Sequence, residues 1–209
     1  MALVITVAQQ KGGTGKTTLA ANLAAALAGL RRVALVDTDP QHSLARWHGL
    51  RTARASPAPA IAFSDTAGWR LSGELDRLRR AQDVVLIDSP PQIDTDARLA
   101  IRAADLVLVP VQPSLPDLWA AEGTLALAAA ERRPARLVLN RAPASGRLRE
   151  QVETAIAAAA LPRLAAVLGN RIAFAQAFAD GLGVTEAAPR GVAAAELRAL
   201  LTEIEDTIR

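Results

Sequence analysis

QQKGGTGKTT, residues 9–18, is the stretch that decides the fold. It follows an apolar run, LVITVA (3–8), and leads into an alanine- and leucine-rich segment at 17–28. A strand, a glycine-rich loop and a helix N-terminus in this order form a cradle whose backbone N–H groups bind phosphate. Its glycines let those groups point inward without Cβ clashes. The stretch therefore predicts a phosphate-binding loop, and its candidate contacts are Gly12, Gly13, Thr14, Gly15, Lys16, Thr17 and Thr18.

Lysine is used only in this loop. The chain has 24 basic residues, and all of them except Lys11 and Lys16 are arginine. Lys16 can place its ammonium group against the β- and γ-phosphates of a nucleotide, while the Thr17 hydroxyl can bind Mg²⁺. The strict pattern G-x-x-x-x-G-K-[ST] fails at Gln10, where its first glycine would stand, but the variant KGGTGKT (11–17) is complete. The bland alternative is a fortuitous glycine-rich turn.

Length and composition indicate one globular domain over residues 1–209. The chain is 51% hydrophobic but only 3% aromatic, so alanine and leucine must fill most of the core. It contains no cysteine, which excludes a disulfide framework, a thiolate metal site and a cysteine nucleophile. The N-terminus lacks a basic signal-peptide region, and no apolar stretch reaches the roughly 18 residues that a membrane span needs. We expect a cytoplasmic protein.

The apolar pattern predicts a doubly wound α/β fold with a mostly parallel sheet and helices on both faces. Its apolar runs are continuous, as in strands buried on both faces, and helical segments separate them. The strands are expected at 3–8, 33–36, 84–87, 106–111 and 137–139, and the helices at 17–28, 71–80, 117–132, 148–160 and 191–208. The core stripe of the last helix is Leu197, Leu200, Leu201, Ile204 and Ile208. Residues 52–60, TARASPAPA, are expected to form a loop.

Polar residues follow the apolar runs at the edge where open α/β sheets bind ligands. DTDPQ (37–41) and DSPP (88–91) each come directly after a run, and Asn140 ends another. Such residues are common in ordinary turns and caps. Beside a phosphate loop, however, their carboxylates can bind near Mg²⁺ or orient an attacking water.

These motifs together resemble the ParA/MinD superfamily of P-loop ATPases. KGGTGKTT (11–18) resembles its deviant Walker A motif, and DTDPQ and DSPP resemble its switch I and switch II. VPVQPS followed by DLWA (109–120) is closer to small plasmid-type ParA proteins than to MinD. The resemblance implies a P-loop ATPase fold with ATP and Mg²⁺ as cofactors, and slow hydrolysis stimulated by a partner.

The resemblance also implies a role for each matching residue. Lys16 serves its own subunit's nucleotide, whereas Lys11 reaches across an ATP-dependent sandwich dimer to the partner's phosphates. Asp39 is implied to be needed for hydrolysis. The remaining implied contacts are Thr17, Asp37 and Asp88 near Mg²⁺ and Asn140 at the adenine.

Positive charge is unevenly spread. Residues 131–171 hold eight arginines against three glutamates, and residues 46–80 hold seven arginines against three acids. These are either solvated helix faces or the footprint of a polyanion. The family implies non-specific DNA binding, a nucleoid-associated location, and a ParB-like or cargo-adaptor protein as activating partner. The candidate contacts are Arg141, Arg147, Arg149, Arg163, Arg171 and Arg190, with Arg171 and Arg190 preferred.

Two other functions are weighed. A MinD-like membrane ATPase needs a basic amphipathic tail, but LLTEIEDTIR (200–209) is acidic, so we expect no membrane partner. A metabolic P-loop ligase would leave Lys11 and DTDPQ unexplained. His42 and His48 are expected to be surface helix residues, and the sequence leaves open whether Trp47, Trp69 and Trp119 belong to the core or to an interface.

Overall fold

A parallel sheet forms the centre of the molecule. The computed structural model describes residues 2–56, 58–66, 68–92 and 95–209. Within these ranges seven strands form one sheet in the order β3-β2-β4-β1-β5-β6-β7, and all neighbouring strands are parallel. The strands are β1 Leu3–Val7, β2 Val33–Asp37, β3 Ala62–Asp65, β4 Val84–Asp88, β5 Leu106–Val111, β6 Ala135–Ala142 and β7 Arg163–Gly169. The predicted α/β fold is confirmed.

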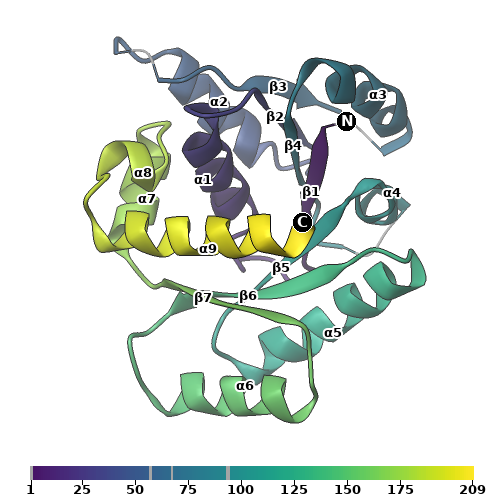
Figure 1. The fold of residues 1–209 in the computed structure, drawn as a ribbon, viewed down its shortest axis with the longest axis vertical. Helices are drawn as coiled ribbons and strands as arrows, with labels where there is room; N and C mark the ends of the chain where they lie inside the picture. The colour runs from purple at the N-terminus through teal and green to yellow at the C-terminus, as the bar shows by residue number, and fades with distance from the viewer. Residues whose placement is uncertain (1, 57, 67, 93–94) are drawn as a thin grey trace.

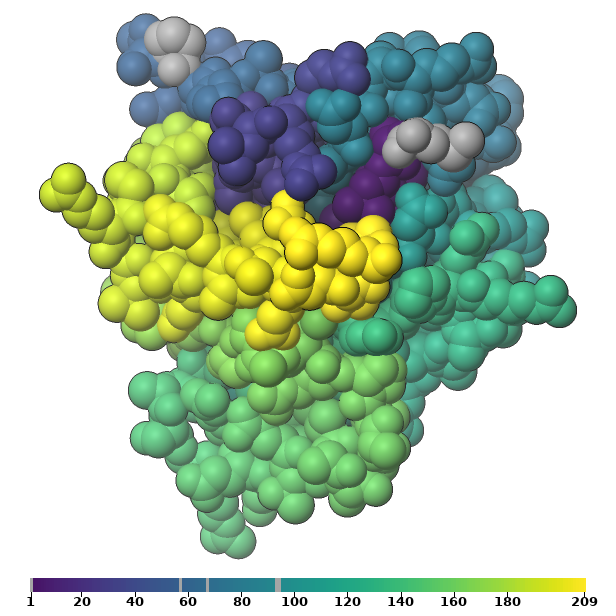
Figure 2. Space-filling view, in the orientation of Figure 1, coloured from purple at the N-terminus to yellow at the C-terminus, as the bar shows by residue number. Residues whose placement is uncertain are grey.

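Helices cover both faces of the sheet (Figure 1). On one face lie α1 Lys16–Ala28, α2 Ser43–Thr52, α7 Ile172–Ala179, α8 Val184–Ala187 and α9 Val192–Ile208. On the other lie α3 Leu71–Ala81, which follows a short 3-10 turn at Gly68–Arg70, with α4 Thr95–Ala103, α5 Leu115–Ala130 and α6 Arg147–Ala158. Figure 2 shows the C-terminal residues, in yellow, as one surface with α7 and α8.

The continuous apolar runs arise because both faces of each central strand are buried. In β1, Val4 packs with α3 and α4, whereas its neighbour Ile5 packs with α1 and α9. Val85 and Leu86 divide in the same way in β4, as the two-residue period of a strand requires. Most positions on both faces are apolar, with Thr6 as a buried polar exception in β1 that donates to the Ala100 carbonyl, so the charged residues gather at the strand ends.

The predicted elements are all present, but the pattern missed others. The structure adds the edge strands β3 and β7 and the helices α2, α4, α7 and α8. Residues of β3 and β7 are mostly half-buried or exposed, so edge strands show no continuous apolar run. In the last helix Leu197, Leu200 and Ile204 are buried, while Leu201 and Ile208 are only partly buried against the same core. Residues 53–56 and 58–60 form the expected loop, and residue 57 lies outside the described residues.

Arg51 joins α2 to α8 through a buried ion pair and also bonds to the segment just before α8. Both terminal nitrogens of Arg51 donate to the Glu186 carboxylate, at 2.8 and 2.7 Å, and one also donates to the Gly181 carbonyl at 3.3 Å. The Trp47 indole donates to the Leu182 carbonyl nearby. Gly181 has φ +67°, and a Cβ there would collide with the Arg51 backbone, so only glycine fits. Arg51, one of the arginines of the basic segment 46–80, is therefore an internal residue.

Candidate nucleotide-binding site

The loop between β1 and α1 has the backbone geometry of a phosphate cradle. Gly13 and Gly15 adopt left-handed φ angles of +79° and +93°, which favour glycine. A Cβ on Gly15 would lie 2.6 Å from the amide nitrogen of Asn140, and that amide donates to the Thr14 carbonyl at 2.8 Å. The end of β6 thus holds the loop in place, while the N-terminus of α1 faces the space in front of it.

Two adjoining cavities open at this loop. A polar cavity of about 250 Å³ is lined by Lys16 and Thr17, by Asp39 of the loop after β2, and by loop glycines including Gly12. A second cavity of about 420 Å³ has a more apolar lining that includes Phe174. The two share Thr18, Arg141 and Phe178 as lining residues.

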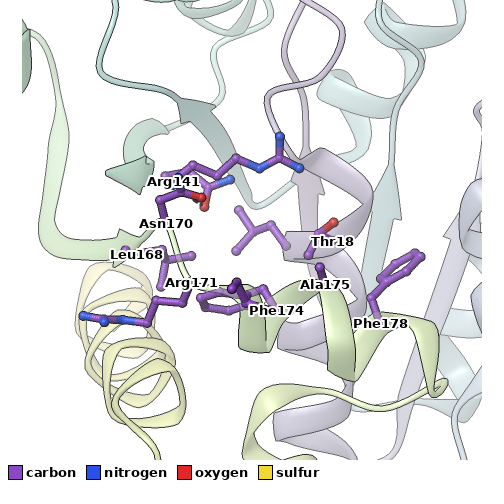
Figure 3. A pocket seen from close by; sticks show the side chains of 12 residues that line it. Thr18, Arg141, Leu168, Asn170, Arg171, Phe174, Ala175 and Phe178 are labelled. Carbon is purple, nitrogen blue, oxygen red and sulfur yellow. Dashed lines mark hydrogen bonds between the residues drawn. The ribbon is translucent and has the colours of Figure 1, made fainter. Parts of the chain in front are cut away.

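The side chains around the larger cavity come from α1, β6, β7 and α7. Figure 3 shows Thr18, Leu168 and Phe174 around it, with Arg141 above and the Arg171 side chain turned toward α9. Together the two cavities offer one end suited to phosphates and one end suited to a flat, partly apolar group.

Three buried aspartates lie at the strand ends that face the loop. Asp37 pairs with Asp88 in the β2–β4 register, and Asp39 follows two residues later. The two oxygens of Asp37 accept the backbone amides of Asp39 and Ala45, at 3.1 and 3.0 Å. Among the described residues, neither oxygen of Asp88 has a partner at ordinary hydrogen-bond distance and angle, although the Thr17 hydroxyl is close enough to lower its pKa. A buried carboxylate without a donor is costly, so Asp88 is suited to receive a cation.

Burial dominates the electrostatics of this group. It raises the pKa of Asp88 to about 7; the nearby Thr17 hydroxyl and Lys16 ammonium oppose this, while Asp37 adds to it. Burial likewise raises the pKa of Asp37, against the two backbone amides that it accepts. Burial lowers the pKa of Lys16, opposed by the charges of Asp88 and Asp39. The site therefore pairs a desolvated cation with desolvated carboxylates, as an anion and metal site requires.

Lys11 is turned toward its own subunit. Its ammonium group pairs with Asp117 at the start of α5; the Lys11 side chain is 44% exposed and the Asp117 side chain only 3%. The same carboxylate accepts the Ser114 hydroxyl at 2.9 Å, and Ser114 caps α5. Sequence reasoning did not single out Asp117, although the DLWA motif that contains it was a signal that could have identified this partner of Lys11.

The structure does not gather the candidate DNA-contacting arginines into one group. Arg141 donates to the Gly13 carbonyl at 3.0 Å, at the nucleotide cavities. Arg149 and Arg163 share Glu153, and Arg171 pairs with Glu196 at 2.5 Å. Among the described residues, Arg147 and Arg190 alone of the six have no side-chain hydrogen bond or ion pair.

The histidines and tryptophans divide between surface and interior. His42 is exposed at the N-cap position of α2, with its Nδ1 3.0 Å from the Asp65 carboxylate. The expectation of a surface residue is wrong for His48, which is half-buried, stacks on Phe63 and bonds to the Ile61 carbonyl. Trp47 is fully buried in the core, while Trp69 and Trp119 are 77% and 62% exposed. Trp47 is thus a core residue, and the other two lie at the surface.

Comparison with known proteins places the chain in a family. The model of the CobQ/CobB/MinD/ParA nucleotide-binding domain matches residues 5–184. Maintenance of carboxysome distribution protein A of Halothiobacillus neapolitanus is 32% identical over 97% of this chain and 96% of its own length. The chromosome-partitioning ATPase Soj of Thermus thermophilus is 38% identical over 60% of this chain and 59% of its own length.

Solved structures share the fold. Apo McdA of Cyanothece superposes with a TM-score of 0.83 at 20% identity, covering 98% of this chain and all of that one. The cell division ATPase MinD of Pyrococcus furiosus superposes with a TM-score of 0.80 at 24% identity, covering 99% of this chain and 100% of that one. The fold and the site define a P-loop nucleotide-binding protein. The chain belongs to the CobQ/CobB/MinD/ParA nucleotide-binding domain family, within which it is similar to the ParA-type positioning and partition ATPases named above.

Proposed function

We propose that the chain is a ParA-like ATPase that positions a cargo. It binds ATP with Mg²⁺, forms a sandwich dimer, binds DNA non-specifically, and hydrolyses ATP slowly until a partner stimulates it. The observation that carries the proposal is the placement of the only two lysines. Lys16 is buried between the phosphate loop and the aspartates, whereas Lys11 stands partly exposed at the loop entrance.

The residues around the polar cavity have different roles at the phosphates. Lys16 binds the β- and γ-phosphates, and the backbone N–H groups of residues 12–18 bind the remaining oxygens. Asp39 lines the cavity, and its Oδ1 already accepts the Gln41 amide at 2.9 Å. This fixes the carboxylate in position to orient the attacking water and to take up its proton.

The donor set next to Lys16 fits Mg²⁺. Asp88 has two buried oxygens without a hydrogen-bond partner among the described residues, the Thr17 hydroxyl lies nearby, and Asp37 completes a set of hard oxygen donors. Bound Mg²⁺ supplies neutralisation of the charge on the β- and γ-phosphates. A single-residue variant of McdA from Cyanothece was solved as a complex with ATP, and a MinD of Pyrococcus horikoshii was solved with Mg-ADP.

The larger cavity takes the nucleoside. Asn140 lines it, and its side chain is held by the Thr14 carbonyl and the Arg141 amide. Its second amide hydrogen remains available for the base. Phe174 and Leu168 supply apolar surface for the ring.

The cargo is proposed from the relatives. The most extensively matched relative named above maintains carboxysome distribution, and Soj partitions chromosomes. The alignment with the carboxysome-distribution protein covers nearly all of both chains. This favours a protein assembly over a plasmid or chromosome region as cargo. A ParB-like or adaptor protein on that cargo would stimulate hydrolysis and release the dimer from the nucleoid.

A membrane-bound mode is not favoured. The apolar stripe of α9 packs into the core, where Leu197, Leu200 and Ile204 are buried. None of the helices in the described residues is long and apolar enough to cross a membrane.

Gel filtration with and without a slowly hydrolysed ATP analogue, followed by co-sedimentation with duplex DNA, tests the proposal. The expected result is an analogue-dependent dimer that sediments with DNA of any sequence. Lys16→Gln should remove nucleotide binding in calorimetry, because the main positive charge at the phosphates is lost. A wild-type chain that stays monomeric with the analogue, or a Lys16→Gln variant with unchanged affinity, overturns it.

A further inference from the structure

A groove lies between α3 and α4, on the face of the sheet opposite α1 and α9. It encloses about 270 Å³, and no residue that lines it also lines the nucleotide cavities. Its apolar floor includes Leu71, Leu75 and Leu99, of which the first two are buried. Helices α3 and α4 contact each other and the 3-10 turn that precedes α3, and Figure 1 shows both helices on the same side of the molecule.

The charged residues that line the groove are mostly cationic. Arg79, Arg102 and Arg133 face it, against the single acid Asp76. Glu131 pairs with Arg102 at 2.7 Å and with Arg98 at 3.6 Å, and it also attracts Arg133 from beyond ion-pair distance. The Arg79 side chain donates only to the carbonyl of Ala103, and the Arg133 side chain forms no hydrogen bond or ion pair among the described residues. Two guanidinium groups therefore lack an acidic partner at ion-pair distance, beside an apolar floor.

An exposed tryptophan is one of the residues that line the groove. Trp69 is 77% exposed, in a chain with only six Phe and Trp residues. The Arg70 guanidinium lies 4.7 Å from its ring centroid, so a cation already covers part of the ring. Tryptophan and arginine are the residues that most often dominate binding energy at protein interfaces.

We propose that this groove binds an acidic segment of a partner protein that carries an apolar side chain. The carboxylates of the segment pair with Arg79 and Arg133, and the apolar side chain packs on Leu75 and Leu99 beside Trp69. Duplex DNA fits less well, because phosphates gain nothing from an apolar floor and Asp76 repels them. The inference is independent of the nucleotide chemistry, since the groove shares no residue with that site.

A display selection tests the groove directly. Random twelve-residue peptides are selected on the full-length chain, with counter-selection on Arg79→Glu/Arg133→Glu, and enriched peptides are synthesised and measured by calorimetry. We expect enrichment of Asp and Glu around a Leu, Phe or Trp. We also expect the double variant and Trp69→Ala each to weaken binding about tenfold or more. Thermal unfolding and ATP binding check that every variant folds.

A matched control removes the same charge elsewhere. Arg46 and Arg198 are exposed and outside the groove, so Arg46→Glu/Arg198→Glu should leave peptide affinity within about twofold, once salt screening is equal. Three outcomes overturn the proposal: no enriched peptide, enriched peptides without acidic residues, or equal loss in the control. Loss of duplex DNA binding in Arg79→Glu/Arg133→Glu with no peptide selected would instead assign the groove to nucleic acid.

Discussion

Lys11 and Asp117 are ion-paired within one subunit, across the space between the phosphate loop and the first turn of α5. The pair combines a partly exposed lysine with an almost fully buried aspartate. Lys11 can reach a second subunit's phosphates only if it leaves this carboxylate, so the pair defines a resting position for the lysine.

Lys11→Ala should bind ATP with unchanged affinity, because Lys16 supplies the charge at the phosphates of its own subunit. It should fail to form the dimer, since the cross-subunit contact is missing. Light scattering with a slowly hydrolysed ATP analogue distinguishes the monomer from the dimer. Asp117→Asn is the matched control: it removes the ion pair but keeps the lysine, and it should still dimerise. Lys11→Arg should rescue poorly, because its planar fork differs from a point charge. Equal dimer fractions for wild type and Lys11→Ala would leave the second lysine without a role.

Asp39→Ala should retain ATP binding and lose turnover by about a hundredfold or more, the usual range for a positioned acid–base group. Its carboxylate faces the polar cavity without bonding to Lys16. Phosphate release, measured with and without DNA, reports the loss. His42→Ala, at the cap of the following helix, serves as a nearby control and should keep basal turnover. Normal turnover in Asp39→Ala would move the catalytic role to another residue.

Asp88→Asn should stabilise the nucleotide-free protein at pH 8 and abolish the Mg²⁺ dependence of ATP binding. The folded pKa of Asp88 is about 7, above the unfolded value of about 3.9. The folded state therefore binds this proton more tightly, and the contribution of the group to stability is lost as pH rises from about 4 to 7. Replacing the carboxylate removes that loss, on the order of a few kcal/mol. Denaturant unfolding at pH 5 and pH 8 provides the test, and a variant less stable than wild type at pH 8 would contradict it.

DNA affinity should fall with salt, with a log–log slope of roughly −0.9 for each phosphate neutralised. Arg171→Ala/Arg190→Ala should make that slope shallower. Arg190 should contribute more, because Arg171 must first leave Glu196. Arg31→Ala is a suitable control, since Arg31 is exposed and paired with Glu205. Should the double variant keep the wild-type slope, Arg147 becomes the next candidate, because its side chain is free among the described residues.

Glu186→Gln should destabilise the protein by about 3–5 kcal/mol, the usual range when one partner of a buried pair is removed. Arg51 would keep its charge without a counterion, at 5% exposure. Glu74→Gln offers a control pair, because Arg77 is largely exposed and such pairs contribute little. Chemical denaturation gives the free energy of unfolding of both variants. Equal losses would mean that the buried Arg51 pair contributes no more to stability than the exposed Arg77 pair.

The sequence was most informative at the nucleotide site, where the functional residues lie next to easily recognised apolar strands. The loop at 11–18 and the strand ends at Asp37 and Asp88 were predictable because each follows or ends a nearly continuous apolar run, where a buried charge stands out. The edge strands β3 and β7 were not, since a half-exposed strand has no distinctive run. The long-range pair Arg51–Glu186 was also beyond prediction, because it joins residues 135 positions apart and no motif contains either of them.

The ion pair between Arg51 and Glu186 also couples two distant parts of the chain. Helix α2 begins only a few residues after Asp39, so the C-terminal quarter is anchored to the segment that follows Asp39, the residue proposed to act in hydrolysis. Loss of this ion pair would therefore weaken the contact between α2 and α8, close in sequence to Asp39. The order in which the ribosome delivers the chain matters for the same reason: the phosphate loop emerges first, yet its surroundings are complete only when residue 186 has arrived.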